Sequence, residues 1–397
     1  MTDATTTLPP RRGLTERLGN ELRFVPVAVG LVALFVFFSL QSDVFLTSRN
    51  LNNLLVQSTV TGIIALGLVF VLLVGEIDLS VAATSGVASV LMAKLVVDAG
   101  MPIPVAMAAG VIAGMLIGAA SGRWITLIGV PSFVVTLGVG LLLNGVQLLL
   151  LPRTGRYNLL NTGVEKLAAT NVSGVLAWVL VLGAVAVFLL LRLSTHRSRS
   201  AEGLPASLGT GVILPTSIVA AVLVAVLLFL ENLRGLPMPV ILFIGLLGVM
   251  SYIASETRFG LYLYAIGNNA EAARRAGIPV DRIKIVAFSI AGGMAAFGGI
   301  LSASRILGVS VSSGGGVGGG ALLLESIAAA VIGGVSLFGG RGMVVGALFG
   351  ALIIATVSNG LNLMGVANEA RLIVTGLLLV IAVSIDRGIE KLAGPGS

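Results

Sequence analysis

Long apolar runs recur along almost the whole chain, and short polar connections separate them. Because the hydrocarbon core of a bilayer is about 30 Å thick, a helix needs about 20 apolar residues to cross it. Such runs predict spans near 24–40, 55–74, 79–98, 103–121, 131–151, 174–192, 212–230, 237–255, 283–303, 320–338, 343–362 and 369–386. The pattern therefore predicts an all-α fold, a polytopic transmembrane helix bundle of about 10 to 12 spans.

One short polar stretch interrupts the pattern, because Glu76 and Asp78 stand between two apolar runs. The segment 75–82 is either a break within the membrane or a cytosolic turn between two helices. Glycines at four-residue spacing mark two other places, at 110, 114, 118 and 122 and at 342, 346 and 350. Such stripes let helix backbones approach closely in lipid, so close packing is expected there.

Composition supports a membrane protein. Of the 397 residues, 56% are hydrophobic and 10% are charged, whereas a soluble domain has roughly 25% charged residues. Residues 1–22 lack the short apolar core and small-residue cleavage site of a signal peptide, so a cytosolic tail is expected. Residues 23–392 are expected to form one transmembrane domain, whose short connections leave no room for a soluble catalytic domain.

The basic residues indicate an orientation. When the N-terminus is placed inside, most lysines and arginines fall in cytoplasmic connections, as the positive-inside rule requires. Both termini are then cytoplasmic. The net charge of +7 is explained by this rule, so it indicates no nucleic-acid partner.

A polar segment, YAIGNNAEAARRAGIPVDRIKI (264–285), faces the cytosol in this orientation. Asn268 is expected to cap a short helix whose third residue is Glu271, which approximates a capping box, and Gly277 and Pro279 are expected to end it. A helix this short is marginal alone and needs a surface to dock against.

The two adjacent arginines of this segment allow two interpretations. Arg274 and Arg275 can engage carboxylates of a partner protein in bidentate fashion. Alternatively, the segment is an ordinary capped loop whose arginines only follow the positive-inside rule.

Five motifs, in order, carry a resemblance to a known family: VGEIDLSVA (74–82), GVPSFVVTLG (129–138), TRFGLYLYAIGNNAEAARRAGI (257–278), ESIAAAVIGGVSLFGGRG (325–342) and SNGLNLMGV (358–366). They resemble signatures of the permease subunits of bacterial ABC sugar importers of the ribose and xylose type. A two-span insertion at 195–253 is similar to the longer, xylose-like branch. Two features depart from the family pattern: Glu325 stands where an Asp is usual, and 310–320 is unusually rich in glycine.

The resemblance implies a multi-pass protein of the bacterial inner membrane that imports a monosaccharide, D-xylose or a related sugar, by alternating access. It also implies that 256–282 is a cytosolic coupling loop docking on an ABC ATPase subunit. The docking residues it indicates are Gly267, Asn268, Asn269, Glu271, Ala272, Arg274, Arg275, Gly277 and Ile278.

The other implied partners are an extracytoplasmic sugar-binding protein and a second permease copy, within the lipid bilayer. None of the four lysines follows a glycine, so the chain has no Walker A sequence with its Gly-Lys pair. The chain is therefore expected to be a transport subunit and not an enzyme, without a bound cofactor, while ATP and Mg²⁺ are used by the partner ATPase. His196 stands alone and there are no cysteines, so no metal site is expected.

Polar residues within the apolar runs are candidates for the translocation pathway or its gating. A carboxylate at the bilayer centre costs about 2.5 to 3.5 kcal/mol on insertion scales, so Glu76 and Asp78 are expected to face a cavity, pair or lie at the interface. They allow three roles, which are structure or gating, sugar contact and proton coupling, and Asp78 or Ser80 can cap the next helix. Glu325 is either functional or paired with an arginine.

Neutral polar residues complete the candidate set: Thr136, Asn144 and Asn359, with Ser132 and Gln147 beside them. They suit a pathway for an uncharged polyol, or they form interhelical hydrogen bonds. Two rival functions remain open. One is a proton-coupled secondary transporter that uses the intramembrane carboxylates. The other is a polytopic membrane enzyme, which is disfavoured because no group of His, Cys or paired acidic residues gathers at one membrane face.

Overall fold

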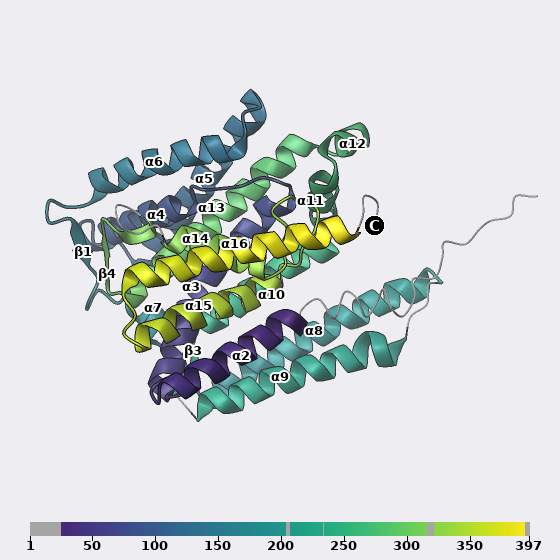
Figure 1. Ribbon diagram of the computed structural model, residues 1–397, viewed down its shortest axis with the longest axis horizontal. Coiled ribbons are helices and arrows are strands. Elements are labelled where there is room, and N and C mark those ends of the chain that lie inside the picture. The colour runs from purple at the N-terminus through teal and green to yellow at the C-terminus, as the bar shows by residue number, and fades with distance from the viewer. Residues whose placement is uncertain (1–24, 204–206, 233, 316–320, 394–397) are drawn as a thin grey trace, which may run out of the picture.

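The computed structural model describes residues 25–203, 207–232, 234–315 and 321–393, and the predicted tail at 1–22 lies outside these residues. One apolar helix lies in each predicted run (Figure 1). These helices are α2 (Val25–Gln41), α3 (Ser48–Leu73), α4 (Val81–Val97), α5 (Ile103–Ile128), α6 (Ser132–Leu150), α8 (Val175–Ala201), α9 (Leu214–Glu231), α10 (Met238–Glu256), α13 (Val280–Arg305), α14 (Ala321–Ile332), α15 (Gly346–Leu363) and α16 (Asn368–Ala393).

Among the described residues, 8 helices are long and apolar enough to cross a membrane. Three more, α2, α4 and α14, are apolar but shorter. The run at 320–338 is not one continuous helix as predicted, because α14 ends at Ile332 after 12 residues. At 1.5 Å per residue, α14 spans about 18 Å, which is too short to cross a bilayer alone.

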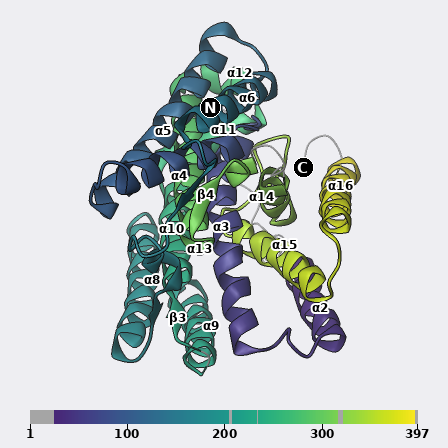
Figure 2. The same cartoon turned by 90° about the vertical axis from the view of Figure 1, so that its left-hand side faces the viewer.

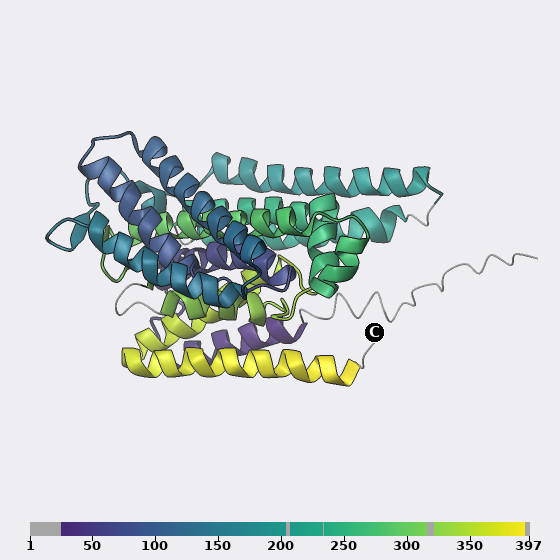
Figure 3. The same cartoon turned by 90° about the horizontal axis from the view of Figure 1, so that it is seen from above.

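Helix α3 lies at the centre of the bundle, and 89% of the residues in its apolar stretch are buried. Helices α4, α5 and α13 pack together beside it, and α14 and α15 cover another of its sides. Figures 2 and 3 show α8 and α9 at one edge of the molecule and α2 and α16 at the other. Large apolar side chains are exposed along the outer helices, Leu149 at 87% and Leu40 at 80%, as a surface that faces lipid requires.

Glycines allow the closest helix contacts. A Cβ atom added to Gly114 or Gly118 of α5 would collide with the carbonyl oxygens of Gly292 and Phe288 on α13. On α15, Gly346 and Gly350 pack equally closely on Gly333 and Ala329. The predicted close packing is confirmed at both places. Gly342, however, lies in the loop before α15 with φ +135°, so it is not part of a helical stripe.

Short elements connect the helices at the two ends of the bundle. At one end lie α11 (Arg258–Asn268) and α12 (Ala270–Arg275). At the other end, β1 (Arg156–Asn158) pairs antiparallel with β4 (Gly308–Ser310), and β2 (Asn171–Val172) pairs with β3 (Leu236–Pro237), beside α7 (Lys166–Ala169) (Figure 1). A π-helical turn, η2 (Gly209–Ile213), precedes α9, and η3 (Ser313–Gly315) follows β4. These two pairs of short strands, β1 with β4 and β2 with β3, are the only strands in the described part of this otherwise helical fold.

Candidate functional site

Two capped helices form the segment predicted to dock on a partner. Thr257 caps α11, because its Oγ1 accepts a hydrogen bond from Gly260 N at 3.2 Å. Asn269 caps α12, because its Oδ1 accepts from Ala272 N at 2.9 Å. The cap predicted at Asn268 is therefore off by one residue. Asn268 ends α11, and its Nδ2 donates to Tyr264 O at 2.8 Å.

The two arginines of α12 each pair with a carboxylate, Arg275 within α12 and Arg274 with the first turn of α13. Arg274 Nη2 lies 3.0 Å from Asp281 Oδ1, and Arg275 Nε lies 3.2 Å from Glu271 Oε1. Glu271 thus pairs with Arg275 and does not complete the predicted capping box. Exposed ion pairs of this kind contribute about 0 to 1 kcal/mol, so a partner's groups can replace them at little cost.

The end of α12 follows the prediction. Gly277 has φ +82°, the left-handed conformation that favours glycine after a helix. Gly277 N donates to Arg274 O at 3.0 Å, and Ile278 N donates to Ala273 O at 3.1 Å. Ala273 is buried while Ala272 is exposed, so α12 rests on the bundle by one face and presents the other to solvent.

Residues 74–80, which we call the interruption, separate α3 from α4. Its Asp78 is packed within the protein: the residue is 1% exposed, and its Oδ1 accepts hydrogen bonds from Ser80 N at 2.8 Å and Ser80 Oγ at 2.6 Å. Glu76 forms an ion pair with Lys284 of α13. Structural anchoring, one of the three roles considered for these carboxylates, accounts for both sets of contacts.

Hydroxyl groups of α6 satisfy the backbone of the interruption. Ile77 N donates to Ser132 Oγ at 3.1 Å, and Leu79 N donates to Thr136 Oγ1 at 3.0 Å. A segment without helical hydrogen bonds is tolerated in a membrane protein only where other groups replace those bonds. Ser132 and Thr136 supply the replacement hydrogen bonds here.

The remaining candidates lie apart from this cluster. Asn359 of α15 and Asn50 of α3 exchange two hydrogen bonds of 2.9 Å, both buried. Asn144 Oδ1 is buried without a hydrogen-bond partner among the described residues. Glu325 lies within electrostatic range of Arg305 and Arg371. The structure therefore does not bring the predicted pathway residues together at one site.

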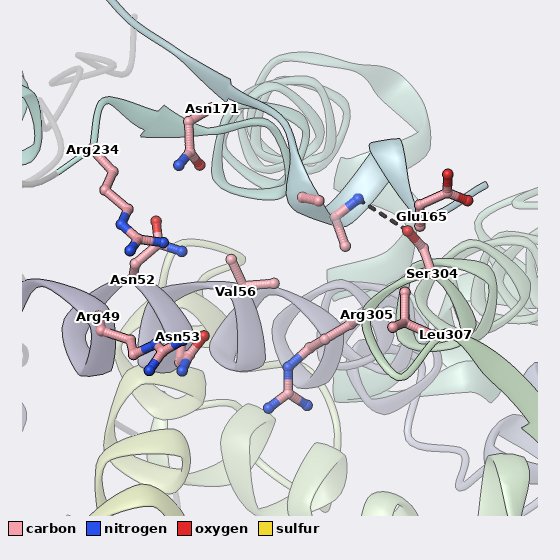
Figure 4. Close-up of a pocket in the computed structure, with 12 residues that line it drawn as sticks. Arg49, Asn52, Asn53, Val56, Glu165, Asn171, Arg234, Ser304, Arg305 and Leu307 are labelled. Atoms are coloured by element: carbon pink, nitrogen blue, oxygen red, sulfur yellow. Dashed lines mark hydrogen bonds between the residues drawn. The ribbon is translucent and has the colours of Figure 1, made fainter. Parts of the chain in front are cut away.

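A pocket of about 550 Å³ opens at the end of the bundle opposite α12 (Figure 4). We call it the arginine pocket, and its lining is Arg49, Asn52, Asn53, Val56, Glu165, Ala168, Ala169, Asn171, Arg234, Ser304, Arg305 and Leu307.

Positive charge dominates the arginine pocket. None of the four salt bridges found in the described part of the chain involves Arg49, Arg234 or Arg305. Arg49 and Arg305 extend toward each other along α3 in Figure 4. Glu165 is the one carboxylate in the lining, and its Oε2 accepts a hydrogen bond from Gly163 N at 2.8 Å.

Comparison with known proteins identifies the kind of protein. Residues 50–383 match the family described as branched-chain amino acid transport system / permease component. The chain belongs to this permease family.

Its relatives include sugar permeases. The chain is 33% identical over 327 residues to the xylose transport system permease protein XylH of Escherichia coli K12, covering 82% of each chain. It is 34% identical over 372 residues to XylH of Haemophilus influenzae, covering 91% of this chain and 96% of the relative. The D-allose transport system permease protein AlsC of Escherichia coli K12 is 29% identical over 356 residues, with 90% and 89% covered. No solved structure matches the permease.

This membership confirms the expected class. The permease is the transmembrane component of an ABC import system, not an ATPase, and a multi-pass protein of a bacterial inner membrane. Within the described residues, no group of three or more His, Asp or Glu side chains is placed to hold a metal ion.

Sequence reasoning missed several residues of the permease. Lys284 pairs with Glu76 although 208 positions separate them, and Asn50 pairs with Asn359 across 309. Gly340 lies in the motif at 325–342, but the motif does not show that Gly340 N donates a hydrogen bond to Leu73 O at 2.9 Å. Arg49, Arg234 and Arg305 are far apart in the sequence, and no local pattern shows that they converge.

Proposed function

We propose that this permease carries a monosaccharide, D-xylose or a close relative, into the cell by alternating access, driven by a separate ABC ATPase. The relatives named for xylose and allose transport support a sugar as cargo. The absence of a Walker A sequence agrees with ATP hydrolysis, and its Mg²⁺, residing on the partner.

One observation carries the proposal: two helices run the length of the molecule between α12 and the arginine pocket. Helix α3 begins beside Arg49 and ends at Leu73, and α13 begins five residues after α12 and ends at Arg305. Each has 26 residues, or about 39 Å at 1.5 Å per residue. A partner that moves α12 can therefore act on the opposite end through two continuous helices.

The ATPase is proposed to dock on α12, with the coupling loop 256–282 on the cytosolic side. The exposed face of α12, the small side chains of Ala272 and Ala276, and weakly paired arginines support a protein contact there. Coupling requires that the ATPase bind α12 differently in its two states, since equal affinity would shift nothing.

The arginine pocket is proposed to receive acidic side chains of the extracytoplasmic sugar-binding protein. Guanidinium groups bind carboxylates in bidentate fashion, and opposite charges across an interface raise the association rate and fix its register. Two permease copies with two ATPase subunits are proposed to form the complete importer, with both termini of each permease in the cytosol.

Reconstitution tests this function. Uptake of xylose into proteoliposomes should require the permease, its ATPase, its binding protein and ATP together. The variant Arg49→Glu should slow uptake by weakening the binding-protein contact, whereas Arg153→Glu, an exposed arginine at the same end but outside the pocket, should not. Uptake by the permease alone, driven by a proton gradient, would overturn the proposal and favour the secondary transporter.

A further inference from the structure

Three segments of the chain meet beside α12. They are the interruption, the last turn of α11 at Gly267, and the loop between α14 and α15. Gly340 N, in that loop, donates a hydrogen bond to Leu73 O, the last residue of α3, at 2.9 Å. A Cβ atom added to Gly339 would lie 2.8 Å from Gly75 Cα and 3.0 Å from Gly267 O. We call Gly75, Gly267, Gly339 and Gly340 the glycine junction.

Three of the four glycines, Gly267, Gly339 and Gly340, leave no space for a side chain. A Cβ atom on Gly267 would collide with Leu73 O and Gly340 N, and one on Gly340 would lie 2.7 Å from Asn268 Cγ. The obstructing groups at Gly267 are backbone atoms, which cannot rotate away. Packed contacts of this kind shift between discrete arrangements and do not deform gradually. A displacement at Gly267 must therefore move the end of α3.

A second attachment joins the chain after α12 to the interruption. Lys284, in α13, forms the ion pair with Glu76, and the two side chains are 19% and 16% exposed. Gly267 precedes α12 and Lys284 follows it. Helix α12 thus lies, along the chain, between one attachment to the end of α3 at Leu73 and one to the interruption at Glu76.

The opposite side of the interruption is held differently. There, its backbone contacts α6 through the hydroxyls of Ser132 and Thr136. In both bonds the hydroxyl oxygen accepts from a backbone N–H, and a neutral hydrogen bond of this kind adds little net free energy because another acceptor, such as water, can replace it. The contacts on the α12 side are close backbone packing and an ion pair, whereas the contacts with α6 are two hydrogen bonds that other partners can replace.

We propose that Gly267, Gly340 and Lys284 are positioning residues that transmit displacement of α12 to the interruption and so separate α3 and α4 from α6. This inference rests on the proposed function, because it assumes that the ATPase moves α12. When α12 is pulled, the interruption follows it, and the hydrogen bonds to Ser132 and Thr136 are the contacts that break.

The experiment measures sugar transported per ATP hydrolysed in the reconstituted complex. Lys284→Met should lower this ratio about tenfold, which corresponds to about 1.4 kcal/mol, while the amount of assembled complex stays unchanged. Lys284→Arg should restore much of the ratio, as should the exchange of charges in Glu76→Lys with Lys284→Glu. A purely structural role would change the yield of complex and not the ratio.

Gly267→Ala should uncouple the permease in the same way, and Gly248→Ala is its control, because a Cβ atom there meets nothing within 4 Å. If the Gly267→Ala permease does not assemble with the ATPase, the transport ratios of the Lys284 variants test the inference. An unchanged ratio in assembled Lys284→Met overturns the inference. Failure of the wild-type permease to bind the ATPase, or uptake without ATP, would instead overturn the proposed function.

Discussion

The paired amides of Asn50 and Asn359 show how a polar residue inside an apolar helix need not line a pathway. Each side chain donates to the other at 2.9 Å, and both are buried. Removing one partner leaves the other unsatisfied at a cost of about 1 to 3 kcal/mol, whereas replacing both with apolar groups is nearly neutral.

Asn359→Leu should therefore lower the Tm of the detergent-solubilised permease by several degrees, and the double variant Asn50→Leu with Asn359→Leu should recover part of the loss. Thermal unfolding measures this, with sugar uptake of the double variant as the second readout. If the double variant is as stable as the wild type but transports no sugar, Asn359 belongs to the pathway as first expected from the sequence.

The pair of Asp98 and Tyr157 makes stability depend on pH. Tyr157 Oη donates to Asp98 Oδ2 at 2.5 Å, in the connections at the arginine-pocket end. This hydrogen bond, more than the nearby Lys94, lowers the pKa of Asp98. Burial, with the neighbouring carboxylate, raises the pKa of Tyr157 from 10.0 to about 12.

The direction of each effect follows from linkage. Asp98 stabilises the fold above its ordinary pKa of 3.8, and this contribution is lost as the pH falls through its lowered value. Tyr157 stabilises the fold fully below pH 10.0, and its contribution is lost as the pH rises toward about 12. Tyr157→Phe should be less stable than the wild type at pH 7, and the Tm difference should shrink between pH 10 and pH 12. A difference that stays constant over that range would contradict this account.

At the scale of the element, the contact between α5 and α13 depends on glycine. Gly118→Ala should destabilise the permease by about 1 to 3 kcal/mol, the usual cost of overpacking, because the added Cβ meets the backbone of Phe288. Gly183→Ala on α8 is the matched control, since nothing lies within 4 Å of its Cβ. Because alanine has less conformational freedom than glycine to lose on folding, Gly183→Ala should stabilise the helix by about 0.5 to 1 kcal/mol. Opposite signs of the two Tm shifts are the expected result.

Helix α12 provides a second test at this scale. Arg274→Glu with Arg275→Glu places like charges beside Asp281 and Glu271, and reverses the charge offered to the ATPase. The variant should remain in the membrane but lose co-purification with the ATPase. Arg197→Glu with Arg199→Glu, also exposed at the end of α8, changes the charge equally and should have no such effect. Equal behaviour of the two variants would count against docking at α12.

These elements differ in how far the sequence predicts them. Glycine spacing identified the face of α5 that packs on α13, because a close approach needs small residues at a fixed interval. The α12 cap was placed one residue early, since Asn268 and Asn269 are chemically identical caps and only the end of α11 distinguishes them. The run at 320–338 was predicted too long because hydropathy does not separate α14 from the apolar loop after it. Contacts such as Glu76 with Lys284 join distant segments, and no local pattern contains them.

At the scale of the whole molecule, the connections divide between two ends, and the proposed function requires these ends to face opposite sides of the membrane. The chain has no cysteine, so a single introduced thiol can be labelled without background. Ala272 is exposed on α12, and Leu160 is 52% exposed at the arginine-pocket end.

A membrane-impermeant maleimide should label Leu160→Cys in spheroplasts and leave Ala272→Cys unlabelled, whereas inverted vesicles should give the reverse. The distribution of lysine and arginine predicts this direction. Labelling of Ala272→Cys from outside would place α12 beyond the reach of a cytosolic ATPase. Labelling of both thiols from one side would mean that α3 and α13 do not cross the bilayer between them. Either result would remove the basis for coupling through these two helices.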